Sequence, residues 1–212
     1  SLLFYFFNPF FQFANFNNTI FDNVSQGSGG GIFFSHSSPT ISGNTIFGNS
    51  STQGRGGGLY INSPGLWYHN IIVENNSFLR NHAGGAGGGI AIVDISAGSS
   101  NSSRYIMGNI IRENSSMGDG GGIFLEESSL RISQNEVSYN SSGGDAGGIY
   151  CYWFSSPLID SNLLLGNVSL GFGGAISCKN QSDPFIDRVT AFGNLALKRG
   201  GGKQTFATLL KK

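Results

Sequence analysis

The sequence predicts an all-β protein built of similar, stacked coils, because three short patterns recur in phase along its 212 residues. The first pattern is a glycine cluster followed by an aliphatic residue, and successive copies lie 26 to 33 residues apart. A repeat of that length is typical of proteins whose units stack along one axis. The aliphatic residues of this pattern are Ile32, Leu59, Ile90, Ile123, Ile149 and Ile176.

The second pattern is a pair of asparagines five residues apart, with a weaker copy at Val189–Asn194. The third is an aliphatic residue three positions before the first member of every copy but the first. The distance from the second asparagine to the next aliphatic residue of the glycine pattern is nine or ten residues. The repeats therefore differ in length at one other connection, between that aliphatic residue and the next asparagine pair. Variation at a single connection is how a surface loop behaves on a fixed repeat. The pairs are Asn18–Asn23, Asn44–Asn49, Asn76–Asn81, Asn109–Asn114, Asn135–Asn140 and Asn162–Asn167. The third pattern comprises Ile41, Val73, Ile106, Ile132, Ile159 and Ile186.

Each repeat therefore holds three short runs of alternating apolar residues, which predict three short strands. No stretch shows apolar residues at helical spacing over three turns. Strands that stack on their equivalents one repeat later form parallel sheets, and parallel crossovers are right-handed in nearly all proteins. The predicted fold is a right-handed parallel β-helix, a single-stranded solenoid of about seven coils with three short strands per coil.

We expect a single domain over residues 1–212. The repeats cover about residues 18–203, after an apolar segment or partial coil at 1–17 and before a C-terminal tail or cap at 204–212. The opening apolar stretch is interrupted by Asn8 and Pro9, well short of a membrane span. The chain reads as a piece of a larger protein.

Alternation along a strand sends every second side chain inward, which buries the aliphatic residues of the glycine pattern and the residues two positions further on. We expect the paired asparagines to form internal ladders, each amide bonding to its copies in the neighbouring coils. Cys151 and Cys178 occupy the same inward position of successive coils and should be neighbours. Free thiols are favoured, because stacked parallel positions suit a disulfide dihedral poorly; a disulfide is the alternative.

The composition excludes several classes of function. Charged residues make up 11% of the chain, and 12 Lys and Arg balance 12 Asp and Glu, so no basic stripe is available for nucleic acid. Two cysteines and three scattered histidines leave little for a metal centre. We therefore expect no nucleic-acid partner, no metal site, no cofactor and no membrane span in this segment.

Outward positions of the first predicted strand carry a row of aromatic rings, which can stack on sugar rings or pack against a partner. The alternative is that a loop covers them, such as the long insertions after Leu59 and Ile90. The candidate binding residues are Phe33, Tyr60, Phe124, Tyr150, Tyr152 and Trp153.

The same positions hold few groups that could catalyse a reaction. Asp94 and Glu127 on adjacent coils, with Glu126 and Lys179 nearby, are the candidates for glycoside hydrolysis or a lyase reaction. Adjacent coils lie only about 4.8 Å apart, closer than the carboxyl groups of an inverting glycosidase. The alternative is that all four are solvated edge charges, and we assign no catalytic residue.

The third predicted strand also points apolar groups outward, an arrangement that favours lateral contact with another molecule or domain. These residues are Phe21, Phe47, Leu79, Leu163, Leu165 and Phe192.

Two segments carry a family resemblance. Gly173-Gly-Ala-Ile176 and Phe78-Leu-Arg-Asn81 resemble the GGA[I/L/V] and FxxN repeats of chlamydial polymorphic outer-membrane proteins, which are autotransporter adhesins. The resemblance spans about residues 18–203 and implies a β-helix that acts at a cell surface, with a carbohydrate or surface protein as its partner.

Three functions are compatible with these observations. The first is a non-catalytic extracellular or cell-surface module that acts as a rigid spacer, an adhesion segment or a glycan-binding segment. The second is a polysaccharide-active enzyme, a lyase or glycoside hydrolase, or an inactive relative of one. The third is a subunit of an extracellular filament that associates laterally or end to end.

Overall fold

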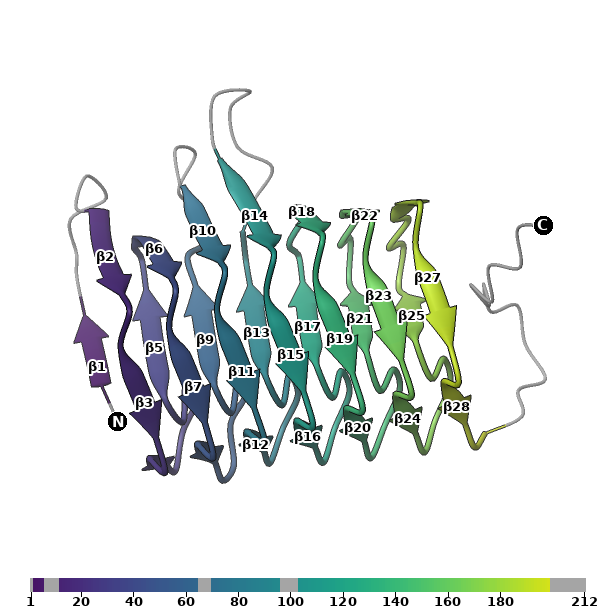
Figure 1. Cartoon of the computed structure of the whole chain (residues 1–212), viewed down its shortest axis with the longest axis horizontal. Helices are drawn as coiled ribbons and strands as arrows, with labels where there is room; N and C mark the ends of the chain where they lie inside the picture. Colours follow the sequence, from purple (N-terminus) through teal and green to yellow (C-terminus); the bar gives the residue numbers. More distant parts are fainter. Residues whose placement is uncertain (1, 6–11, 65–69, 96–102, 199–212) are drawn as a thin grey trace.

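The computed structural model describes residues 2–5, 12–64, 70–95 and 103–198 of the chain. In this part the chain forms 28 strands and no helix. The strands build four parallel sheets of seven strands each, and the chain visits all four in turn before it begins the next coil (Figure 1). The predicted all-β solenoid of seven coils is confirmed.

The four sheets are named A to D in the order in which the chain meets them. Sheet A contains β1 (Leu2–Tyr5), β5 (Ile32–Ser35), β9 (Leu59–Asn62), β13 (Ile90–Val93), β17 (Ile123–Glu126), β21 (Ile149–Tyr152) and β25 (Ile176–Lys179). Sheet B contains β2 (Gln12–Phe16), β6 (Ser38–Ser42), β10 (Ile71–Glu74), β14 (Arg104–Met107), β18 (Arg131–Ser133), β22 (Leu158–Asp160) and β26 (Phe185–Asp187). Sheet C contains β3 (Thr19–Phe21), β7 (Thr45–Phe47), β11 (Ser77–Leu79), β15 (Ile110–Arg112), β19 (Glu136–Ser138), β23 (Leu163–Leu165) and β27 (Thr190–Phe192). Sheet D contains β4 (Val24–Ser25), β8 (Ser50–Ser51), β12 (His82–Ala83), β16 (Ser115–Ser116), β20 (Ser141–Ser142), β24 (Val168–Ser169) and β28 (Leu195–Ala196).

Each complete coil has four strands, whereas the sequence predicted three. The additional strand is the two-residue strand of sheet D, which follows the second asparagine of each pair. Small polar dipeptides such as those of β8 and β20 show no alternation of apolar and polar residues, so periodicity does not reveal them. The expected tail or cap at 204–212 lies outside the described residues.

The core is a narrow column between the sheets, and the predicted inward residues fill it. Ile123 of sheet A pairs in register with Ile149, so equivalent side chains stack on one another. Each fully buried aliphatic or aromatic side chain contributes about 1.5–3 kcal/mol. Fully buried members include Ile32, Phe34, Ile41, Ile46, Leu59, Ile61, Phe78, Ile90, Ile111, Ile132, Cys151 and Leu164.

Two asparagine ladders run through the corners on either side of sheet C, as predicted. Asn114 illustrates the pattern: its Nδ2 donates to the carbonyl of Phe78 at 2.9 Å and to Oδ1 of Asn140 at 3.0 Å. Its Oδ1 accepts from the backbone N–H and the Nδ2 of Asn81, at 2.9 and 3.0 Å. The ladder thus satisfies backbone groups that the corner would otherwise leave unpaired in the core.

A serine ladder, which was not predicted from the repeat patterns, lies at the corner between sheets A and B. The backbone N–H of Ser128 donates to Oγ of Ser155 at 3.1 Å, and the N–H of Ser155 donates to Oγ of Ser182 at 3.1 Å. Ser37 makes the same contact with Ser63 at 3.2 Å. At this corner serine hydroxyl groups therefore accept hydrogen bonds from backbone N–H groups, as asparagine amides do at the two corners beside sheet C.

The glycine clusters occupy the corner between sheets D and A, where adjacent coils approach closely. A Cβ added to Gly57 would lie 2.4 Å from the carbonyl oxygen of His82 and 2.5 Å from that of Gly88. Gly56 has a φ of +67°, which side chains rarely adopt. This corner therefore requires glycine for two reasons, the close approach of adjacent coils and the positive φ.

The two cysteines are neighbours, as predicted, because Cys151 of β21 pairs in register with Cys178 of β25. Both thiols are free. The hydrogen bond with Cys178 and burial raise the pKa of the Cys151 thiol, which keeps it unreactive in the core.

Candidate functional site

The outer face of sheet A carries five of the six aromatic binding candidates, and Trp153 follows directly after β21. The structure divides the six by exposure. Phe124 and Tyr150 are only 3% and 2% exposed, whereas Trp153 is 44% exposed. The buried rings are Tyr60, Phe124 and Tyr150, the half-buried rings Phe33 and Tyr152, and the exposed ring Trp153. An outward direction from the sheet is therefore not the same as access to solvent.

Residues just before the glycine clusters cover the buried rings. The guanidinium of Arg55 lies 5.0 Å from the centre of the Phe124 ring, and Ala86 and Ala146 pack into the same hydrophobic cluster. The insertions after Leu59 and Ile90, named as the covering segments from the sequence, lie partly outside the described residues. In the described residues, the buried rings are covered by the corner between sheets D and A, which precedes the strands of sheet A, whereas these insertions follow them.

The candidate charges of this face are engaged or sit at the strand ends. Glu126 forms an ion pair with Arg55, and Lys179 forms one with Asp145. Asp94 and Glu127 occupy equivalent places one residue beyond β13 and β17, both with left-handed backbone. The structure thus brings Asp94 and Glu127 to adjacent coils, as expected, but the other two candidates already have partners.

Two carboxylates that were not predicted from the sequence lie at the corner between sheets D and A. Asp119 and Asp145 occupy equivalent positions on adjacent coils, and the N–H of Asp145 donates to Oδ1 of Asp119 at 2.7 Å. The N–H of Phe172 donates to Oδ1 of Asp145 at 2.8 Å. Burial and the Asp145 carboxylate raise the pKa of Asp119. Alignment of the residues four positions before the aliphatic residue of each glycine pattern would have revealed this pair, since Asp119 precedes Ile123 and Asp145 precedes Ile149 by that distance.

These carboxylates also affect the buried ring beside them. Burial, and then the nearby charges of Asp119 and Asp145, raise the pKa of Tyr150. The hydroxyl therefore stays protonated throughout the pH range in which proteins are folded.

The turn after sheet A opens into an exposed aromatic site on the sixth and seventh coils, after β21 and β25. Trp153 and Phe154 are 44% and 55% exposed, and their ring centres lie 6.1 Å apart in an edge-to-face arrangement. Tyr152 adds a third ring, 5.9 Å from Trp153. Together with Asn180 and Gln181 of the next coil, Trp153 and Phe154 line a hollow of about 240 Å³. Trp153 and Tyr152 were predicted from the sequence; Phe154, Asn180 and Gln181 were not.

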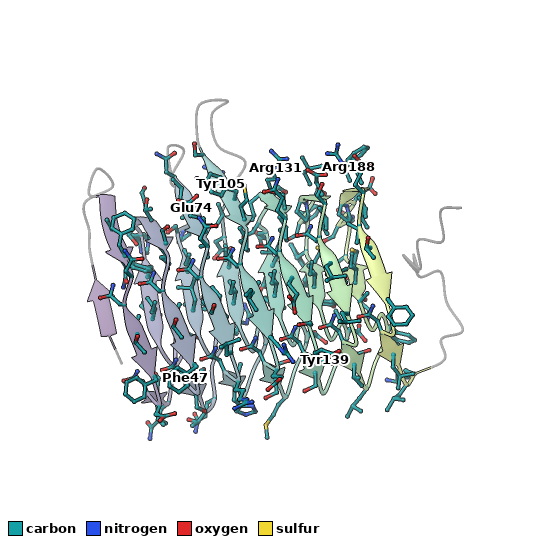
Figure 2. The ribbon with its side chains drawn as sticks, in the orientation of Figure 1. Phe47, Glu74, Tyr105, Arg131, Tyr139 and Arg188 are labelled. Atoms are coloured by element: carbon teal, nitrogen blue, oxygen red, sulfur yellow. The ribbon has the colours of Figure 1, made fainter. Side chains whose placement is uncertain are left out.

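Sheet B carries polar side chains on its outer face, and Figure 2 shows Glu74, Tyr105, Arg131 and Arg188 along the upper edge of the β-helix. The hydroxyl of Tyr105 donates to Glu74 at 3.2 Å. Arg188 and Arg131 donate to the two oxygens of Asp160, at 2.7 and 2.8 Å. These hydrogen bonds lower the pKa of Asp160 to about 2. The pairs join successive coils and leave no carboxylate of this group without a partner.

Sheet C bears the predicted outward apolar residues. The rings of Phe21 and Phe47 stack with centres 5.2 Å apart, and Phe192 at the other end is 72% exposed. Between these ends, a hollow of about 470 Å³ is lined by Phe47, Ser77, Leu79, Arg80, Ile110, Arg112 and Glu113. Phe47 and Tyr139 mark this lower part of the molecule in Figure 2.

Among the described residues, no group of three or more His, Cys, Asp and Glu side chains is placed to hold a metal ion. Nor does this part of the chain contain a helix that is long and apolar enough to cross a membrane.

Comparison with known proteins agrees with the architecture. Residues 12–164, well over half of the chain, match the family model described as a right-handed beta helix region. No curated protein and no solved structure matched the chain. With its four parallel sheets and continuous internal ladders, the chain belongs to the right-handed β-helix family.

Proposed function

We propose that this chain is a rigid, non-catalytic spacer module of an extracellular or cell-surface protein. The observation that carries the proposal is the continuity of the asparagine ladders. One runs from Asn18 to Asn162 and the other from Asn23 to Asn194, with an amide contact at each step. Every coil is thereby fixed to the next, so the module has a constant cross-section along its length.

The distribution of outer side chains supports the same function. Glu126, Lys179 and Asp160 are each bound by residues of other coils. Such pairs lock neighbouring coils together and leave these groups engaged in structural contacts. A spacer needs this rigidity, whereas an acid or base in catalysis must be free to meet its substrate.

Deletion of one whole coil tests the proposal. Removal of residues 123–148 joins Gly122 to Ile149, the in-register equivalent of Ile123, so all ladders remain aligned. We expect this variant to unfold cooperatively and to keep the β circular dichroism of the parent chain. Deletion of residues 123–135 serves as the control; it breaks the register and should prevent folding.

The same proteins are then incubated with acidic and neutral polysaccharides, with and without Ca²⁺. The spacer function predicts no release of oligosaccharides by the parent chain. Release by the parent chain that the coil deletion abolishes would overturn the proposal, because the deletion removes Glu126 and Glu127.

Polysaccharide cleavage is a second candidate, favoured by the Asp119–Asp145 pair. The two aspartates project from equivalent positions of adjacent coils, whose backbones are about 4.8 Å apart, and retaining glycosidases use two neighbouring carboxyl groups. The raised pKa of Asp119 suits a general acid. In this case the parent chain releases oligosaccharides and Asp119→Asn does not.

A further inference from the structure

The turn after sheet A has a different backbone on two adjacent coils. After β5, β13 and β17, one residue has positive φ: His36, Asp94 and Glu127. After β21 and β25, two consecutive residues do, namely Trp153 with Phe154 and Asn180 with Gln181. Positive φ is an outlier for bulky side chains and costs of order 1–3 kcal/mol per residue, so it persists only where the surrounding structure holds it.

Backbone hydrogen bonds between coils hold this turn in place. The N–H of Phe154 donates to the carbonyl of Asn180 at 3.0 Å, and the carbonyl of Trp153 accepts from the N–H of Glu127 at 2.9 Å. The backbone that carries the two rings is therefore held in place by the neighbouring coils before any ligand arrives. Such preorganisation lowers the entropy cost of binding.

The four lining residues offer a specific combination of chemistry. Trp153 and Phe154 supply apolar ring surface, and the exposed amides of Asn180 and Gln181 each supply two N–H donors and a carbonyl acceptor. All four are uncharged. A pyranose ring has the complementary surface, with C–H groups on its face and hydroxyl groups around its edge. At about 240 Å³, the hollow is smaller than pockets for drug-sized ligands (about 300–1,000 Å³), which suits one ring.

We propose that this hollow binds one uncharged pyranose ring, stacked on an aromatic side chain and hydrogen-bonded by Asn180 and Gln181. The inference goes beyond the spacer function, which needs no ligand, and either can fail without the other. The ring has two sources: a free oligosaccharide, or a glycan on Asn180 itself, since Asn180-Gln181-Ser182 is an acceptor sequence for N-glycosylation.

The first experiment uses protein made in bacteria that lack N-glycosylation, with Trp67→Phe so that Trp153 is the only tryptophan. Chitotetraose, cellotetraose and mannotetraose are titrated while the Trp153 fluorescence is followed. A free-sugar site gives a saturable change with at least one of them. Phe154→Ala and Asn180→Ala should each weaken that binding at least fivefold. Phe192→Ala, which removes an exposed ring on sheet C, should leave it unchanged.

The second experiment uses the same chain secreted from glycosylating eukaryotic cells. If the bacterial protein binds none of the sugars, a glycan mapped to Asn180, with Trp153 fluorescence that differs from that of the bacterial protein, assigns the hollow to the chain's own glycan. Circular dichroism of every variant confirms that it has folded. If the bacterial protein binds no sugar and the glycosylated protein has the same Trp153 fluorescence, or no glycan is attached, the proposal is overturned.

Discussion

The aromatic residues on the outer face of sheet A and those in the turn that follows it are close in sequence but have opposite surroundings. Phe124 and Tyr150 lie within the sheet and are almost completely buried beneath Arg55 and Ala146. Trp153 lies only three residues after Tyr150, yet it is exposed because the chain has already turned away from the cover. Residues of the corner between sheets D and A thus cover Phe124 and Tyr150, which form a buried structural cluster. Trp153 lies beyond this cover, on a surface that is open to a ligand.

The largest expected effect on stability comes from a substitution among the covered rings of sheet A, Phe124 and Tyr150. Phe124→Ala should lower the free energy of unfolding by about 3 kcal/mol, because it leaves a cavity beside Tyr150 and Arg55. Chemical denaturation monitored by circular dichroism measures the change. A loss of stability below about 1 kcal/mol would show that Arg55 and its neighbours pack only loosely over Phe124. The covered rings would then not differ in role from the exposed Trp153.

Arg55→Ala tests the cover itself. It removes the cation–π contact with Phe124 and the ion pair with Glu126, so we expect a loss of about 1 kcal/mol. The matched control is Arg80→Ala, whose pair with Glu113 is on the surface, so its loss of stability should be clearly smaller than that of Arg55→Ala. Equal effects of the two substitutions would contradict the covering role.

Asp119 gives the covered corner a pH dependence. Because its pKa is raised in the folded chain, the folded state holds this proton at pH values where the unfolded chain, with a pKa of about 4, has lost it. Stability from this group is therefore gained below the ordinary pKa and falls as pH rises through the raised one. Asp119→Asn can still accept the N–H of Asp145, so its melting temperature should exceed that of the parent chain more at pH 7 than at pH 3.5. A lower melting temperature at pH 7 would contradict this.

The smallest effect on stability is expected from a substitution of Trp153, in the exposed turn after sheet A. Trp153→Ala should change the free energy of unfolding by about 0.5 kcal/mol or less, because nearly half of the side chain is in solvent. The same denaturation curves measure it. A loss as large as that of Phe124→Ala would mean that Trp153 is a structural residue and would remove the basis for a ligand site.

The interior followed from the sequence because it is periodic. The columns that contain Ile123 and Ile149, and the ladder that contains Asn114 and Asn140, repeat at fixed spacing, so stacking places each residue beside its copy. The strands of sheet D escaped prediction because two residues are too few to show a period. Ser155 escaped because serine is common in this chain and only some copies of its corner carry it.

The candidate site followed less completely, for a physical reason. Period-two alternation correctly sends Tyr60 and Phe124 out of sheet A, but it contains no information about what packs above them. The covering contacts join residues of different coils, such as Arg55 and Glu126, and depend on the path of the corner. The Asp119–Asp145 pair was overlooked because it precedes the glycine cluster, outside the strand positions that alternation describes.

The sequence by itself determined the coil, its seven repeats, the buried columns and the asparagine ladders, because in a solenoid each residue meets its own copy one repeat later. Only the tertiary structure decided which outward side chains are covered and which remain open. That choice depends on how each corner folds over the next coil and, at Trp153 and Phe154, on left-handed backbone that the spacing of residues does not encode.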